Sequence, residues 1–306
     1  MSAGSAVLRQ PATREQASRR TGRGFRAWRQ VRRRPLYAIA ALMLTLVVLT
    51  ALFGFALPLP AANEPSLRDR LVAPMSHGQS GTLHLLGTDH LGRDVAARMV
   101  AGARVTVGIA GSVALIGAVV GSTMGLIGGY RRGIVDAIVM RLADLQMAFP
   151  SLLLAIFVLY VLGAGIWQLV GFLAFLSWIS FARFARAQTL SLRSQPFVEA
   201  AVGLGASERR VLFRHVLPQL MPLLVMITVL DFGTVMLAEA GLSFLGMGTQ
   251  PPDASWGSMV ADGREYVAAG AWWLFLTPGL AVFLTVFAAN LTSRWVQELM
   301  GVTRRD

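Results

Sequence analysis

Long apolar stretches separated by short polar segments dominate the pattern along the chain. A helix needs about 20 mostly apolar residues to cross the hydrocarbon core of a bilayer. Six stretches meet or approach that length, and we expect each to form a transmembrane helix: 36–59, 105–129, 145–162, 166–181, 217–237 and 272–291. The pattern therefore predicts an all-α membrane protein with six spans.

Several of these stretches carry features that shape the expected helix. Pro150 is expected to kink the third span, and the fourth is short enough that we expect it to continue past Arg183. Tryptophans flank the last span, as they do at membrane interfaces. The first stretch also resembles a cleaved signal peptide, but its basic leader of about 35 residues is far longer than an ordinary one. An uncleaved span is favoured.

Composition agrees with a membrane protein. Hydrophobic residues make up 55% of the chain and charged residues only 14%, against about 25% charged in soluble domains. The chain has no cysteine, which excludes disulfides and thiolate metal sites. Its formal net charge is +12, so nucleic-acid binding has to be considered. The positive charge is concentrated before the first span, where a membrane anchor explains it better.

The distribution of charge between the predicted loops gives an orientation. The loops on the side of the termini sum to +16, and those on the other side to −2. Positive loops stay in the cytoplasm, so both termini are expected there. The predicted organisation is a basic cytoplasmic arm (1–35), a first span (36–59), an extracytoplasmic loop (60–99), a five-helix core with a cytoplasmic loop at 190–218 (100–297), and a cytoplasmic tail (298–306).

Four glycines at a spacing of four share one face of the second span: Gly117, Gly121, Gly125 and Gly129. Small residues let another helix approach closely. The neighbour is either a partner subunit or moving helix, or another helix of the same bundle, and the sequence leaves both open.

Asp231 and Glu239 are acidic residues in or near the fifth span. Charges within a membrane are costly, so they are candidates for lining a transport pathway. For Glu239 the alternative is a position at the membrane interface, and for Asp231 it is a paired, structural role.

The loop 190–218 has a predicted structure of its own. Pro196 suits the first turn of a short helix, and Gly203 and Gly205 are expected to end that helix. Ser207 is expected to cap a second, Arg-rich helix, and Pro218 is expected to open the next span. Such a loop either docks into a partner protein or lies on the headgroups as an amphipathic element.

The same loop resembles the EAA motif of the permease subunits of binding-protein-dependent ABC importers. The motif residues are Glu199, Ala200, Ala201, Gly205, His215, Leu217 and Pro218. His215 stands where the family commonly has isoleucine, a usual variant in its dipeptide and oligopeptide branch. LGTDHLGRD (86–94), GGYRRGIVD (128–136), AEAGLSFLG (238–246) and QPPDASWG (250–257) resemble the second, C-type permease of dipeptide, oligopeptide and nickel importers. Asp231 departs from the small apolar residues usual there.

The resemblance implies a MetI-like, type I permease fold in a bacterial inner membrane and a non-catalytic role. Implied partners are a homologous second permease, two cytoplasmic ATPases, a substrate-binding protein outside, and membrane lipid, but no nucleic acid. ATP and magnesium would be used by the ATPases, with no cofactor in this chain. The motif loop would be the coupling segment, and di- or oligopeptides are the expected substrates, with nickel, glutathione or another small solute as alternatives.

A membrane enzyme and an ion-coupled secondary transporter are the two alternative classes of function. Motifs of membrane enzymes such as H-E-x-x-H or G-x-S-x-G are absent from the sequence. His77, His84 and His90 share the first outer loop, but solvated histidines explain them better than a metal site does. An ion-coupled secondary transporter also has spans, glycine seams and buried acids, yet it has no use for an ATPase-docking loop. A phosphate-binding G-x-x-x-x-G-K-[ST] needs lysine, and the chain has none, so ATP hydrolysis needs a separate polypeptide.

Overall fold

The structure, a computed structural model, describes residues 35–300. The predicted arm (1–35) and most of the tail (298–306) lie outside the described residues.

Ten α-helices make up most of the described chain: α2 (Pro35–Phe53), α3 (Val95–Arg131), α4 (Gly133–Met147), α5 (Ser151–Leu162), α6 (Ile166–Arg193), α7 (Pro196–Gly203), α8 (Glu208–Val211), α9 (Leu217–Phe244), α10 (Trp256–Gly263) and α11 (Trp273–Met300). Between α2 and α3 lies a two-stranded antiparallel hairpin of β1 (Ser76–His77) and β2 (Leu83–His84), in which Ser76 pairs with His84.

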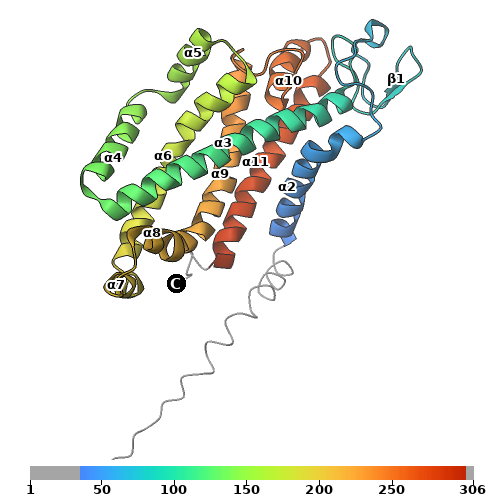
Figure 1. Ribbon diagram of the computed structural model, residues 1–306. Helices are drawn as coiled ribbons and strands as arrows, with labels where there is room; N and C mark the ends of the chain where they lie inside the picture. The colour runs from blue at the N-terminus through green and yellow to red at the C-terminus, as the bar shows by residue number, and fades with distance from the viewer. Residues whose placement is uncertain (1–34, 301–306) are drawn as a thin grey trace, which may run out of the picture.

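The long helices form one bundle whose two ends differ (Figure 1). One end carries the hairpin, α5 and α10, and we call it the hairpin end. The other carries α7 and α8, together with the start of α2 and the end of α11, and we call it the α7 end. Because α2 begins and α11 finishes at the α7 end, the described chain crosses the bundle an even number of times.

Among the described residues, five helices are individually long and apolar enough to cross a membrane. The pair α4 and α5 makes a sixth crossing if it is taken as one span, and it is bent by 85°. The break lies at 148–150, where Pro150 precedes α5, because proline disrupts a helix. An all-α membrane fold is confirmed.

The boundaries of three expected spans need correction. The third was expected at 145–162, but the pair of α4 and α5 begins at Gly133. The second span was expected to begin at residue 105, but α3 begins at Val95 and runs for 37 residues. Asp94 caps it, because its Oδ1 accepts a hydrogen bond from the backbone N–H of Ala97 (2.9 Å).

Pro218 lies in the first turn of α9, as expected, but α9 is continuous with the helical turns before it. One continuous helical segment runs from Glu208 to Phe244, and Leu212–Val216 within it forms a π-helical turn. Proline lacks the N–H that a regular helix requires, and a wider turn just before it tolerates that loss. The Arg-rich helix of the predicted loop is therefore continuous with the helix of the fifth span.

The glycine seam of α3 packs against α6. A Cβ atom added to Gly121 or Gly125 would overlap the backbone carbonyl oxygen of Trp178 or Ala182, and one on Gly129 would lie 2.9 Å from that of Arg186. The seam thus makes a close contact within the same chain. Of the two interpretations left open by the sequence, the structure supports packing against another helix of the same bundle.

Candidate functional site

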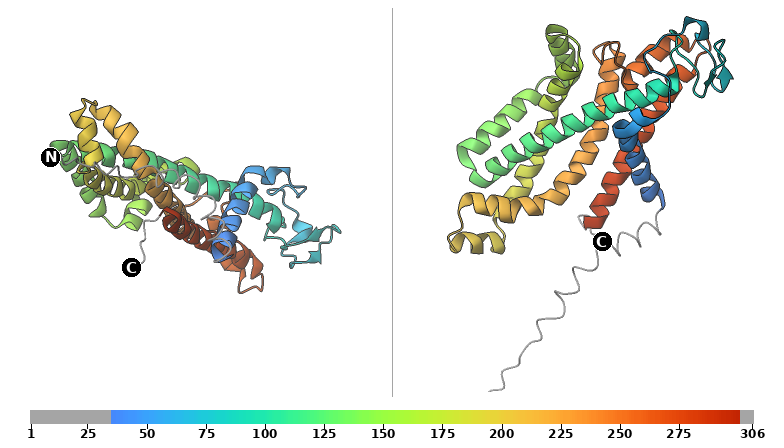
Figure 2. Two further views of the ribbon diagram at one scale, coloured as in Figure 1. Left: turned by 90° about the horizontal axis from the view of Figure 1, so that it is seen from below. Right: turned by 45° about the vertical axis from the view of Figure 1, so that its right-hand side comes forward.

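Helix α7 projects from the α7 end of the bundle, beyond the ends of the long helices (Figure 2, right). Pro196 occupies its first turn, and Val198 is buried against the core formed by α3, α6 and α9. The chain reverses after α7 at Gly205, whose φ of +79° lies in the region that favours glycine. These features present the opposite face of α7 to the surroundings.

The exposed face of α7 combines a carboxylate with apolar side chains. Glu199 and Ala200 are exposed, whereas Ala201 is half-buried. Phe197, Val202 and Leu204 are also exposed, and Leu204 reaches 89%. An exposed apolar patch of this kind marks a contact surface for another protein or a membrane.

Two polar contacts join the helix ends that flank α7. Arg131, at the end of α3, donates from Nε to Oε1 of Glu208 (2.8 Å). Arg193, at the end of α6, donates from Nη1 to the carbonyl oxygen of Tyr130 (2.6 Å). The first contact joins α3 to α8, which follows α7, and the second joins α6, which precedes α7, to α3.

The remaining residues of the predicted loop motif lie at the start of the long helical segment 208–244. His215 is half-buried in the π-helical turn, and Leu217 and Pro218 follow it. The structure therefore divides the motif between α7, the Gly205 turn and the base of α9. That these residues contact an ATPase stays a prediction.

The two acidic candidates differ in their surroundings. Glu239 is 1% exposed, and its Oε1 accepts hydrogen bonds from the hydroxyls of Ser243 (2.8 Å) and Ser255 (2.6 Å). Its Oε2 has no hydrogen-bond partner within the described part of the chain. Asp231 is half-buried and accepts a hydrogen bond from Ser177 of α6 (2.5 Å). Both carboxylates thus join α9 to neighbouring segments, and a pathway role for either stays a prediction.

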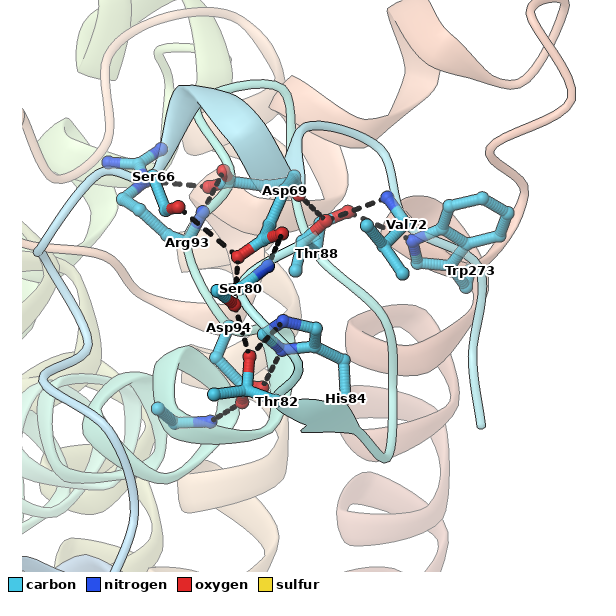
Figure 3. A network of polar contacts seen from close by, with 12 residues as sticks. Ser66, Asp69, Val72, Ser80, Thr82, His84, Thr88, Arg93, Asp94 and Trp273 are labelled. Carbon is cyan, nitrogen blue, oxygen red and sulfur yellow. Dashed lines mark hydrogen bonds and ion pairs between the residues drawn. The ribbon is translucent and has the colours of Figure 1, made fainter. Parts of the chain in front are cut away.

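The segment 60–94 at the hairpin end is organised by buried polar contacts (Figure 3). Asp69 accepts hydrogen bonds from the backbone N–H (3.1 Å) and hydroxyl of Ser80. The hydroxyl bond has the larger effect, and together the two bonds hold the pKa of Asp69 below its ordinary value. Thr88 accepts from the N–H of Val72 (2.8 Å), and its carbonyl oxygen accepts from Trp273 Nε1 of α11 (3.1 Å). The segment is therefore a folded unit fastened to the bundle.

The sequence suggested that all three histidines of this segment are solvated, but in the structure their exposure differs. His84 is buried, and its Nδ1 lies 2.8 Å from Oδ2 of Asp94, the residue that caps α3. His90 stacks on Tyr266 with ring centroids 5.0 Å apart. His77 is exposed. The described residues contain no group of three or more His, Cys, Asp or Glu that is arranged to hold a metal ion.

Sequence reasoning did not identify the contacts of the LGTDHLGRD stretch. Asp89 accepts from the backbone N–H of Leu91 (2.8 Å) and from Arg93 Nε (2.6 Å), and Arg98 approaches it to 3.6 Å. The sequence signal was present, because charged and hydroxyl residues are packed closely there. Their pairing depends on chain reversals that the pattern alone did not predict.

Comparison with known proteins agrees with this arrangement. The model of the family described as "Binding-protein-dependent transport system inner membrane component" matches residues 117–302. A putative peptide transport system permease protein of Brucella suis biovar 1 is 39% identical over 273 residues, which cover 89% of each chain. A glutathione transport system permease protein of Pectobacterium atrosepticum is 36% identical, over 95% of this chain and 94% of that one.

A dipeptide transport system permease protein of Alkalihalophilus pseudofirmus is 34% identical over 90% of this chain and 88% of its own. The family match covers more than half of the chain and includes α7, the Gly205 turn and α9. The resemblance seen in the loop motif is thus confirmed over most of the chain. The chain belongs to the inner-membrane permease components of binding-protein-dependent transport systems.

Proposed function

We propose that this permease carries di- or oligopeptides across the membrane in an importer driven by separate ATPase subunits. The observation that carries the proposal is the projecting α7 surface, in which Glu199 and Ala200 lie beside exposed apolar side chains. Relatives named for peptide, dipeptide and glutathione transport support the substrate class. These three names refer to peptides or to a peptide-like solute.

In this proposal the α7 end faces the cytoplasm and the hairpin end faces outward. The basic loops predicted on the side of the termini support that orientation. The exposed Arg209, Arg210 and Arg214 lie beside α7 and add positive charge at that end. A binding protein would meet the hairpin end, and a second permease would complete the pathway.

Coupling would act through α7. Each ATPase closes on its partner when it binds ATP and magnesium, and the α7 surface would follow it. Because Val198 of α7 packs into the core that α3, α6 and α9 share, movement of α7 would act on those helices through that core. No catalytic residue is assigned to this chain.

The proposal is tested by Glu199→Lys and Gly205→Val in cells that take up a radiolabelled dipeptide through this importer. Glu199→Lys reverses the charge of the docking surface. Gly205→Val forces a β-branched residue to a positive φ, which costs about 1–2 kcal/mol. We expect both variants to reach the membrane in normal amounts and to lose at least about ten-fold in uptake, which corresponds to 1.4 kcal/mol.

The matched control is Glu265→Lys, which reverses an exposed charge at the hairpin end. It should leave ATP-driven uptake much closer to that of the unaltered protein. Normal uptake by both α7 variants would reject coupling through this surface. Absence of peptide uptake by the unaltered importer would reject the substrate class.

A further inference from the structure

A cavity of about 880 Å³ opens at the hairpin end between the end of α2, the first half of α3 and the start of α6. We call it the outer pocket. Its size lies within the range of ordinary ligand sites, about 300–1,000 Å³. Its lining includes Asn63, Arg104, Gly108, Ser112, Trp167 and Asp253.

The outer pocket contains two opposite charges that are not paired. Arg104 of α3 and Asp253 of the segment before α10 both line it, and both are exposed. Among the described residues, neither side chain forms a hydrogen bond or an ion pair within 4.0 Å. The other charged residue of the lining, Arg98, is buried and lies 3.6 Å from Asp89. Arg104 and Asp253 are therefore the charges left for a ligand.

The wall that carries Asp253 is held firmly against α3, on both sides of Arg104 along that helix. The backbone N–H of Trp256 donates to Thr106 Oγ1 (2.9 Å), and Trp256 Nε1 donates to the carbonyl oxygen of Met99 (2.8 Å). A Cβ atom on Gly102 would lie 3.1 Å from Trp256 Cδ1. Asp253 and Arg104 thus belong to two surfaces with a fixed relation.

Glu239 fixes the same wall from the side of α9. Ser255, two residues after Asp253, donates its hydroxyl to Glu239 Oε1, and it also accepts from the hydroxyl of Thr249 (3.2 Å). Ser255 further caps α10 by accepting from the N–H of Ser258 (3.0 Å). Glu239 therefore acts as a positioning residue, because its carboxylate holds Ser255 and with it the wall that carries Asp253.

We infer that the outer pocket binds a zwitterionic peptide, with Arg104 receiving its carboxylate end and Asp253 its ammonium end. The inference rests on the proposed function, because it names the part of this chain that recognises the peptide. A guanidinium binds a carboxylate through charge-assisted hydrogen bonds, and a carboxylate binds an ammonium in the same way. A pocket with one fixed charge of each sign selects a ligand that carries both.

A wide apolar groove adjoins the outer pocket. It has a volume of about 1140 Å³ and lies among α3, α4, α5 and α6, and Trp167 lines both spaces. Most of the side chains that line this groove are apolar, and its lining also includes the uncharged polar side chains of Gln146 and Gln168. A peptide bound by its charged ends in the outer pocket would therefore have its side chains next to an apolar surface.

The test measures uptake of radiolabelled Ala-Ala by vesicles that contain the complete importer. Loss of a hydrogen bond to a charged group lowers affinity by roughly ten-fold or more. We expect Arg104→Gln and Asp253→Asn each to lower kcat/KM for uptake by about ten-fold, and the double variant to lower it by roughly the product. Arg104→Lys, which keeps the charge, should retain most of the uptake.

Matched controls separate charge in the pocket from charge at this end of the protein. Arg68→Gln and Glu265→Gln remove exposed charges outside the lining and should leave uptake unchanged. Normal uptake by Arg104→Gln would overturn the inference. So would a double variant no weaker than either single one, because that result means that the two residues serve only each other.

A steric variant tests the pocket without removing a charge. A Cβ atom on Gly108 meets nothing within 4 Å, and Gly108 lines the pocket. Gly108→Leu should strengthen the helix and fill the space, and we expect uptake to fall at least about five-fold. Gly111→Leu, equally open but outside the lining, should have no such effect, and equal uptake by the two variants would overturn the inference. If the unaltered importer takes up neither Ala-Ala nor a longer peptide, the proposed function itself fails.

Discussion

The glycines of α3 show how a residue with no side chain determines the packing of two helices. Gly117, Gly121 and Gly125 lie where α6 comes so close that any Cβ atom would collide with it. Gly108 and Gly111 lie on the same helix but face open space. The spacing of four predicted the seam, but the sequence did not identify the helix that fills it.

Gly121→Leu is expected to prevent normal packing of α3 on α6. The added side chain would overlap the carbonyl oxygen of Trp178, and backbone cannot move aside as a flexible side chain does. Overpacking of a core costs about 1–3 kcal/mol, and we expect a clear drop in the melting temperature of the purified protein. Gly111→Ala is the control, and it should be neutral or slightly stabilising because it replaces glycine in a helix. An unchanged melting temperature for Gly121→Leu would show that the seam is not a tight contact.

Acidic residues were the least predictable at this scale. Asp231 and Glu239 both appeared from the sequence as costly charges in a span. In the structure one accepts a hydrogen bond from a neighbouring helix, and the other lies within a cluster of hydroxyls from Ser243, Ser255 and Thr249. The partners of Glu239 are up to 16 residues away, in a loop whose path no local pattern determines.

At the scale of elements, the apolar pattern located the six spans but not all of their ends, and it left most of α4 outside the third span. Apolar residues define only the part of a helix that contacts lipid or other helices. Helix α3 continues past that part because Asp94 caps it far from the predicted start. The segment 208–244 continues because a π-helical turn accommodates Pro218. Caps and wider turns depend on backbone contacts that hydrophobicity does not report.

The orientation of the elements is open to a direct test, because the chain contains no cysteine. Met75→Cys places a thiol on the hairpin end, where Met75 is 70% exposed. Ala200→Cys places one on α7. In intact spheroplasts, a membrane-impermeant maleimide should label the first variant, and it should label the second only after the membrane is opened. Labelling in the reverse order would place the α7 end outside and contradict the proposed coupling.

At the scale of the whole molecule, the described chain leaves large apolar surfaces uncovered. Seven of the twelve residues of α5 are exposed, including Leu153, Phe157 and Tyr160, and Leu204 is exposed directly after α7. Helix α5, which lines the apolar groove, lies at the hairpin end, and α7 lies at the opposite end of the bundle (Figure 1). A transport pathway that runs beside α5 would leave only part of the α5 surface for lipid to cover. Helix α7 projects beyond the long helices, where an ATPase would meet it.

The most direct measurement is affinity purification of this chain from its native membrane in mild detergent, followed by identification of every chain that accompanies it. We expect a second permease and one or two ATPases to accompany it, with a binding protein retained when Ala-Ala is present. Glu199→Lys should lose the ATPases while keeping the second permease, because the variant alters only the α7 surface. Recovery of the chain alone, or only as copies of itself, would contradict the account.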